Sequence, residues 1–127
     1  MCIVRRGAHR TCIKSLPVIN PPVCEHCGIA LISEEKLCMR CRERTFSFDA
    51  AHPIWAYYGT ALKLIRMYKF SGERALSLLF AETAASVIAR KFPGLPVVPV
   101  PPSRRSRSEH VTMITRLLKS KYHIPLL

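Results

Sequence analysis

The stretch that governs the fold of this chain is Cys24-Glu25-His26-Cys27, followed after ten residues by Cys38-Met39-Arg40-Cys41. Each Cys-x-x-Cys pair can form a tight turn that directs two sulfurs toward one metal ion, and the loop between the pairs lets them complete a tetrahedron. Gly28 follows the first pair directly, and glycine permits the positive-φ conformation that often completes such a turn. The spacing therefore predicts one structural zinc ion, held by Cys24, Cys27, Cys38 and Cys41.

Other interpretations of the cysteines stay open at this point. Four thiolates also suit iron, and ordinary buried thiols would need no metal. A redox pair would require one Cys-x-x-Cys in a β-α-β context, whereas this chain has two pairs. His26 lies between the first two cysteines and could replace one of them as a ligand. Cys2 and Cys12 have no Cys-x-x-Cys partner and are expected to be bystander thiols.

Targeting and membrane-spanning signals are weak. The basic start of the chain is not followed by a long apolar stretch, and the most apolar region, residues 75–89, is interrupted by Glu82. That region is shorter than the ~18 apolar residues that a membrane helix needs. We expect no membrane insertion and a cytoplasmic protein, and in a reducing cytoplasm paired cysteines indicate metal rather than disulfides.

The net charge of +12 is concentrated in the second half of the chain. Residues 1–50 carry eight Lys and Arg against five Asp and Glu, whereas residues 51–127 carry twelve against three. Such an excess favours a polyanionic partner, either nucleic acid or a phosphorylated ligand, although a basic solvated surface would give the same count.

Apolar periodicity after the cysteines predicts three helices, at about residues 60–68, 73–91 and 108–121. Residues 97–100 are valines punctuated by prolines and are predicted to form a short buried strand. An edge strand is expected around residues 54–58, and a second strand at residues 124–127. The order helix, strand, helix predicts the opening of an α/β unit, which as a truncated piece would be classed α+β.

The four-cysteine module is followed in order by Tyr57-Tyr58-Gly59, Leu62-Lys63-Leu64-Ile65, Tyr68-Lys69-Phe70-Ser71-Gly72 and Val97-Val98-Pro99-Val100-Pro101. In this order and spacing, from about residue 22 onward, the chain resembles the ComF family. These are bacterial competence-associated proteins that join an N-terminal zinc module to a phosphoribosyltransferase-like domain. The resemblance implies an N-terminal extension (1–21), a zinc-binding module (22–44) and a partial phosphoribosyltransferase-like domain (45–127). It also implies a cytoplasmic role in DNA uptake, with incoming single-stranded DNA and competence-machinery proteins as partners.

The chain departs from the family after the valine and proline stretch. Arg104, Arg105 and Arg107 match the family's basic residues, but Ser108-Glu109-His110-Val111 replaces the Arg-Gly-Phe-Asn-Gln-like run that follows them. A phosphoribosyltransferase also needs two adjacent acidic residues and a small-residue loop, which hold the ribose hydroxyls and the 5′-phosphate of the sugar donor. The acids after Asp49 are Glu73, Glu82 and Glu109, and none is adjacent to another. We therefore expect a chain truncated before the catalytic half and inactive alone.

Three groups of residues are candidates for nucleic-acid contact. Arg104, Arg105 and Arg107 lie in a predicted loop, where guanidinium groups pair well with phosphates. Basic residues also recur along the first predicted helix and into its end, at Lys63, Arg66 and Lys69. Trp55, with its neighbours Tyr57 and Tyr58, could stack on unpaired bases, although such aromatics often belong to a core.

The leading hypothesis is a ComF-like, zinc-containing protein that binds single-stranded DNA rather than catalysing. A second is the N-terminal portion of an active phosphoribosyltransferase whose catalytic half lies beyond residue 127. A third is a zinc-dependent protein-interaction module.

Overall fold

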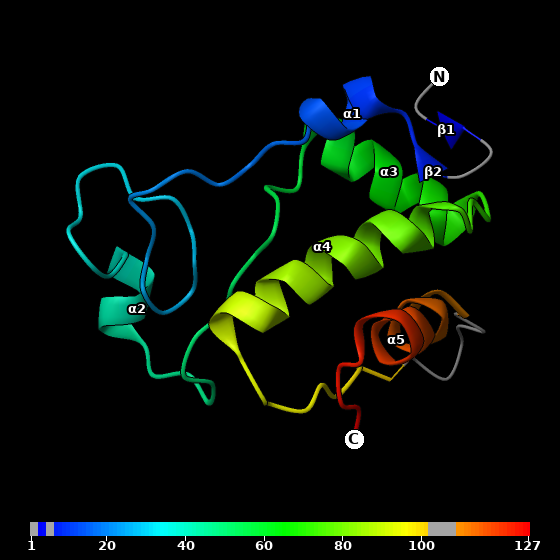
Figure 1. Cartoon of the computed structure of the whole chain (residues 1–127). Coiled ribbons are helices and arrows are strands. Elements are labelled where there is room, and N and C mark those ends of the chain that lie inside the picture. Colours follow the sequence, from blue (N-terminus) through cyan, green and yellow to red (C-terminus); the bar gives the residue numbers. More distant parts are fainter. Residues whose placement is uncertain (1–2, 5–6, 102–108) are drawn as a thin grey trace.

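The computed structural model describes residues 3–4, 7–101 and 109–127. Three helices dominate this part of the chain: α3 (Gly59–Phe70), α4 (Leu76–Lys91) and α5 (Glu109–Tyr122). In Figure 1, α4 crosses the middle of the molecule, α3 and α5 lie on either side of it, and the cysteine loops lie at one end. The remaining elements are short: β1 (Ile3–Val4), β2 (Gly7–Ala8), α1 (Arg10–Lys14) and α2 (Met39–Glu43).

The three predicted helices are confirmed, with small shifts at their ends. α3 ends at Phe70, just before Gly72, which adopts a φ of 70°. α4 begins at Leu76 rather than at residue 73, because a turn comes first in which the Leu76 N–H donates to the Glu73 carbonyl. α5 covers Glu109–Tyr122, and the predicted start at residue 108 lies outside the described residues. The apolar periodicity thus located each helix to within a few residues.

One part of the core joins α3, the start of α4 and the N-terminal segment. Its buried members are Leu16, Ala61, Leu64, Tyr68 and Leu76. Tyr68 also donates its O–H to the His110 carbonyl at the start of α5, over 2.7 Å. Each fully buried leucine here contributes about 1.5–3 kcal/mol to stability through burial alone.

A second part of the core holds α4 against α5. Its buried members are Ala81, Ala85, Leu118 and Ile124. Ala81 and Ala85 lie four residues apart and therefore share one face of α4, where their small side chains let α5 approach closely. At its N-terminus α5 is also tied by an exposed ion pair between Arg74 and Glu109, and this guanidinium lowers the pKa of the Glu109 carboxyl.

Strand is scarce in the described residues, which are mostly helical. β1 and β2 form a two-residue antiparallel pair, and Val97 pairs with Leu126 in an isolated parallel bridge. The prediction of a buried strand at residues 97–100 is wrong, because Val98 is 66% exposed and Val100 is 80% exposed. Prolines in this stretch lack the N–H that a longer ladder would need. The predicted pairing partner near residues 124–127 is present only as that single bridge, and the α/β class stays a prediction.

The segment before the cysteines packs on the helical body instead of extending from it. Leu16 is buried in the first core, and Val18 pairs with Trp55 in an antiparallel bridge. The Ala56 N–H donates to the Pro17 carbonyl over 2.9 Å, so the edge strand expected near residues 54–58 is limited to this contact. The division of the chain at residues 21 and 44 stays a prediction.

Candidate metal centre

The first cysteine pair lies in a hydrogen-bonded turn. The Gly28 N–H donates to the Cys24 carbonyl over 2.9 Å, and the Cys24 N–H donates to the Ile29 carbonyl over 2.8 Å. Val23 and Ala30 then pair in an antiparallel bridge, which closes the base of the turn. This arrangement buries Cys24 and directs the thiols of the pair to one side.

Gly28 completes the turn in the conformation that its sequence position predicts. Its φ is +72°, in the left-handed region that only glycine enters at little cost. A Cβ at this position would lie against the Pro53 ring and 2.8 Å from the Ala51 carbonyl oxygen. The turn therefore requires glycine both for its backbone conformation and for the close approach of residues 51–53.

The second cysteine pair lies at the start of the short helix α2. The Cys38 carbonyl accepts hydrogen bonds from the N–H groups of Cys41 and Arg42, at 3.0 and 3.1 Å. The Cys38 N–H in turn points to the sulfur of Cys24 over 3.4 Å. This last contact fixes the second turn directly against the first.

The two turns bring all four predicted ligands together. The Sγ atoms of Cys24, Cys27, Cys38 and Cys41 all lie within 4.8 Å of one another. The sulfurs of Cys27 and Cys38 are 3.7 Å apart. A tetrahedral ion with metal–sulfur bonds of about 2.3 Å needs sulfurs about 3.8 Å apart, so this donor set fits a closed four-sulfur site. The four cysteines could hold one metal ion.

His26 is a neighbour of this cluster rather than a member of it. Its Nδ1 lies 3.6 Å from the Cys41 sulfur, and its Nε2 lies 2.9 Å from the Phe48 carbonyl oxygen. Its ring stacks on Phe48 with a centroid distance of 4.6 Å, and Phe46 lies at 5.4 Å. His26 thus links the cysteine cluster to residues 46–48, as outer residues commonly do around metal ligands.

Without a cation, the thiols of Cys24, Cys27 and Cys41 differ widely in pKa. Burial opposes ionisation of Cys24, but backbone N–H groups of Cys27, Cys38 and His26 donate to its sulfur and lower its pKa to about 6. Burial and the neighbouring cysteine sulfurs raise the pKa of Cys41 to about 12. The Ile29 backbone N–H donates to the Cys27 sulfur and lowers its pKa, but burial and the sulfurs of Cys24 and Cys38 outweigh this bond, so the pKa of Cys27 is raised. Crowded sulfurs of this kind need a bound cation before all four can be thiolates.

The predicted basic stripe is present on the exposed face of α3. Lys63, Arg66 and Lys69 are all exposed. Lys63 and Arg66 line an open groove of about 580 Å³, together with Met67 and Phe70. Phe70 is 79% exposed. Sequence reasoning missed this aromatic side chain as a functional candidate, although its position one residue after Lys69 was a usable signal.

Trp55 is half-buried and packs against the core rather than standing free on the surface. Its ring lies 6.0 Å from that of Phe80, centroid to centroid. Tyr57 and Tyr58 are in contrast 64% and 63% exposed, just before α3 begins. The structure therefore separates the aromatic trio into one packed ring and two accessible rings.

Two other expectations concern the arginine loop and the cysteine Cys12. Arg104, Arg105 and Arg107 lie outside the described residues, so the arginine loop stays a prediction. Cys12 is disulfide-bonded, and the expectation that it is a bystander thiol is wrong. Cys24, Cys27, Cys38 and Cys41 are free of disulfides, as metal ligands must be.

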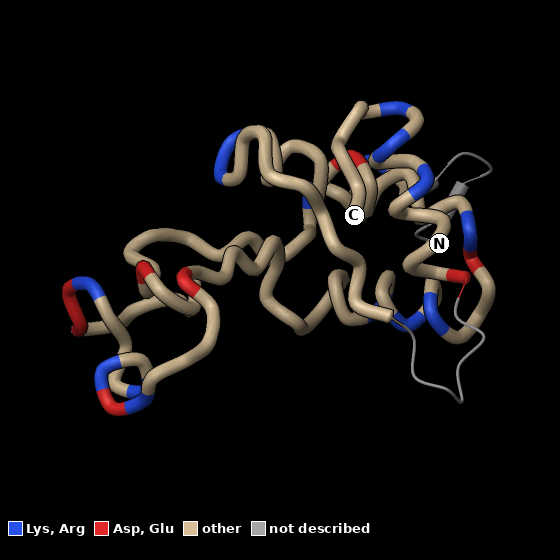
Figure 2. Tube along the Cα trace, turned by 90° about the horizontal axis from the view of Figure 1, so that it is seen from below, with Lys and Arg blue, Asp and Glu red and all other residues tan. Residues whose placement is uncertain are grey.

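The distribution of charge separates the cysteine loops from the helical body. Figure 2 shows both acidic and basic positions on the cysteine loops, whereas basic positions predominate over the helices.

Within the described part of the chain, none of the helices combines the length and the apolar character that a membrane crossing requires. Comparisons with protein-family models, with curated proteins and with solved structures find no match.

Proposed function

We propose that the four cysteines hold one structural Zn²⁺ ion. The observation that carries this assignment is the convergence of four sulfurs within 4.8 Å, with no other ligand type among them. A closed four-thiolate site is typical of structural zinc, which has no open position for a substrate. Zinc also supplies folding free energy in small modules of this kind, because the ligands are gathered only in the folded state.

We further propose that the chain is a ComF-like protein that acts in DNA uptake in the cytoplasm by binding single-stranded DNA, not by catalysis. The resemblance in the order of its motifs supports the family assignment. The absence of an adjacent acidic pair after Asp49 argues against phosphoribosyl transfer by this chain alone. Competence-machinery proteins are the partners that the resemblance implies.

The geometry of α3 supports a single-stranded DNA site on its exposed face. Lys63 and Arg66 line the groove, and no acidic side chain lines it. Exposed aromatics stand at both ends of the helix, Tyr58 before its first residue and Phe70 as its last. A twelve-residue helix is about 18 Å long, enough for a few nucleotides to follow. Cations that track a backbone between stacking rings are the usual means of binding single strands.

The salt dependence of binding tests this function. We expect the logarithm of the affinity for single-stranded DNA to fall with the logarithm of salt, at about −0.7 per phosphate contact. The triple variant Lys63→Ala, Arg66→Ala, Lys69→Ala should flatten that slope by about two units. The matched control Arg116→Ala, Lys119→Ala, Lys121→Ala removes the same charge from the exposed residues of α5. Equal flattening by both triples would show diffuse attraction only.

The second hypothesis, the first portion of an active phosphoribosyltransferase, has one structural observation in its favour. Val97 and Leu126 pair in parallel, and α5 lies between them in the chain. A parallel pair joined by a helix is the repeating unit of α/β sheets. Reading the adjacent DNA for an Asp-Asp-x-x-x-Thr-like continuation distinguishes this hypothesis from the leading one.

The third hypothesis, a protein-interaction module, is favoured by apolar side chains on the cysteine loops. Ile32 is 98% exposed, and Met39 and Ile29 are 61% and 55% exposed. Exposed apolar groups on a small zinc module are a common means of contacting another protein. Absence of salt-sensitive binding to single-stranded DNA would favour this hypothesis over the leading one.

A further inference from the structure

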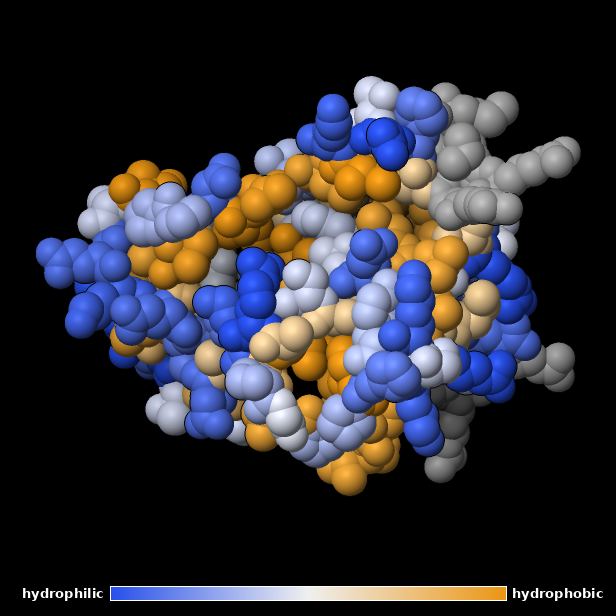
Figure 3. Space-filling view, in the orientation of Figure 1, coloured by the Kyte–Doolittle hydropathy of each residue, from blue (hydrophilic) through white to orange (hydrophobic). Residues whose placement is uncertain are grey.

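A cleft of about 400 Å³ separates the cysteine module from the helical body. It is lined by three parts of the chain: residues on either side of the first cysteine, residues 52–55, and the last two turns of α4. Its volume falls in the range of about 300–1,000 Å³ that is typical of small-molecule sites. Figure 3 shows apolar surface in this region between the cysteine loops and the helices.

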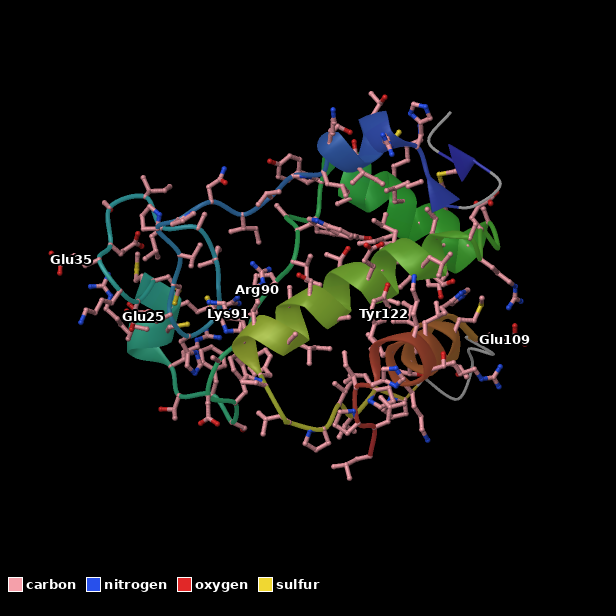
Figure 4. All side chains as sticks on the ribbon, viewed as in Figure 1. Glu25, Glu35, Arg90, Lys91, Glu109 and Tyr122 are labelled. Atoms are coloured by element: carbon pink, nitrogen blue, oxygen red, sulfur yellow. The ribbon has the colours of Figure 1, made fainter. Side chains whose placement is uncertain are left out.

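The walls of the cleft are mainly apolar, with His52, Thr83 and Ser86 as polar members, and its charged groups are basic. Val18, Ile54 and Val87 are among the apolar residues that line it, and Arg90 and Lys91 are the cations. Among the described residues, no acidic side chain lines the cleft. In Figure 4 the side chains of Arg90 and Lys91 lie at the end of α4 that faces the cysteine module. Apolar walls with two convergent cations suit a ligand that has a flat apolar part and an anionic group.

Trp55 provides the flat surface in this cleft. Trp55 lines the cleft, is half-buried, and packs its ring against Phe80. This packing leaves the ring few rotamers to lose on binding, so stacking on it costs little entropy. An aromatic ring that stacks on tryptophan strengthens binding by about tenfold or more, which is enough to select aromatic from simple anions.

We propose that this cleft binds one nucleotide unit, with its base against Trp55 and its phosphate held by Arg90 and Lys91. The site is distinct from the groove on α3, and it rests on the proposed function only in taking nucleic acid as the ligand class. Both a free mononucleotide and the phosphorylated end of a single strand have this chemistry. Val23 and Gly28 also line the cleft, so the cysteine module forms one side of the site.

Tryptophan fluorescence reports on this site directly, because Trp55 is the sole tryptophan of the chain. The experiment titrates the full chain with dTMP, with inorganic phosphate, and with oligothymidylates that carry or lack a 5′-phosphate, and follows the Trp55 emission. We expect saturable quenching by dTMP, with inorganic phosphate at least about tenfold weaker because it cannot stack. Tighter binding of the 5′-phosphorylated strand than of dTMP identifies a strand end as the ligand, and the reverse order identifies the free nucleotide.

Two pairs of substitutions separate a specific site from diffuse attraction. Arg90→Ala with Lys91→Ala should weaken dTMP binding at least about tenfold, since charge-assisted bonds to phosphate are lost. Lys119→Ala with Lys121→Ala removes two cations from the last turn of α5 and should change the affinity less than twofold. Ser86→Glu, which adds a carboxylate to the cleft wall, should abolish quenching without removing any cation.

Several results would overturn the nucleotide site. No saturable change in Trp55 emission, equal weakening by both cation pairs, or equal affinity for dTMP and inorganic phosphate each contradicts it. The triple variant of Lys63, Arg66 and Lys69 should bind dTMP like the unmodified chain. A salt slope that the α3 triple variant leaves unchanged, together with saturable dTMP binding, would reject the DNA groove alone. A slope that this variant flattens, without saturable dTMP binding, would reject the cleft alone.

Discussion

At Gly28 the absence of a side chain is what lets the first cysteine turn lie against residues 51–53. Two requirements coincide there, a φ of +72° and the close approach of the Ala51 carbonyl and the Pro53 ring. Gly72 has a similar φ of +70°, but no atom lies within 4 Å of the place that its Cβ would take. Substitutions at these two glycines therefore distinguish the backbone cost of adding a side chain from its steric cost.

Gly28→Ala should destabilise the protein by more than Gly72→Ala does. Both variants bear a cost of about 1–2 kcal/mol for a side chain in the left-handed region. Only Gly28→Ala adds overpacking against Ala51 and Pro53, which typically costs a further 1–3 kcal/mol. Urea unfolding of the zinc-loaded protein measures both changes. Equal losses for the two variants would mean that residues 51–53 do not press on the turn.

The pKa values of Cys24, Cys27 and Cys41 predict how the affinity for metal depends on pH. At pH 7 Cys24 is largely ionised, with a pKa of about 6, whereas Cys27 and Cys41 keep their protons because their pKa values are raised. Ligands bind as thiolates, so metal binding at pH 7 should release at least two protons per ion. Affinity should fall as the pH falls, and fall more steeply below about pH 6, where Cys24 also takes up a proton.

Calorimetry of zinc binding in buffers of different ionisation enthalpy measures the number of protons released. The lowered pKa of Cys24 also means that its thiolate contributes stability to the metal-free module above its unfolded pKa, and that this contribution is lost as the pH falls through about 6. Release of fewer than two protons per zinc at pH 7 would contradict the raised pKa values of Cys27 and Cys41.

At the level of elements, the contact between α4 and α5 depends on two small residues. Ala81 is fully buried against α5, whereas Ala89 on the same helix is exposed. Ala81→Leu should destabilise the fold by about 1–3 kcal/mol, because the larger side chain forces the helices apart. Ala89→Leu makes the same change in helix propensity and should be nearly neutral. Chemical unfolding followed by circular dichroism compares them, and similar stabilities would show that Ala81 does not set the helix spacing.

Helices were the elements that the sequence could predict. Leu76 in α4 and Leu118 in α5 are among the apolar positions whose helical spacing predicted these helices, and both are buried. The structure of residues 97–100 was harder to predict, because a short apolar run predicts a buried strand whether or not a neighbouring strand exists to cover it. Val98 and Val100 are exposed for lack of such a neighbour among the described residues.

Of the two candidate sites, the cysteine cluster could be predicted from the sequence and the cleft could not. Cys24 and Cys38 each begin a Cys-x-x-Cys pair, and each pair forms a local turn. The spacing of the two pairs was therefore enough to predict the cysteine cluster. The cleft beside Arg90 and Lys91 was not predictable, because it arises from the packing of three distant segments. Trp55 was identified as an aromatic candidate, but its contact with Phe80 appears only in three dimensions.

At the scale of the whole molecule, the cysteine loops lie at one end, and residues 46–51 connect them to the rest of the chain. The Ala51 N–H donates to the His26 carbonyl over 2.7 Å, and Phe48 stacks on the His26 ring. These contacts attach residues 46–51 to the module rather than to the helices. Loss of the metal should therefore disorder the module and residues 46–51 while α4 and α5 keep their mutual packing, whose core residues lie elsewhere.

Hydrogen exchange with and without a chelator measures how far the effect of metal removal extends. Amides of residues 24–51 should lose protection, because metal binding and folding of such modules are coupled. Amides in the second half of α4 and in α5 should keep most of theirs. Uniform loss of protection across the chain would instead show that the module and the helices unfold as one unit.

Elemental analysis of the purified protein tests most directly whether the four cysteines hold a structural zinc ion. We expect about one zinc per chain in the unmodified protein, and well below one in Cys24→Ser or Cys38→Ser, because losing one thiolate weakens both metal binding and the folding coupled to it. The same variants should lose the ordered structure of residues 24–41 in hydrogen exchange. A protein that is folded across these residues but contains no zinc, or contains iron in its place, would contradict the zinc centre.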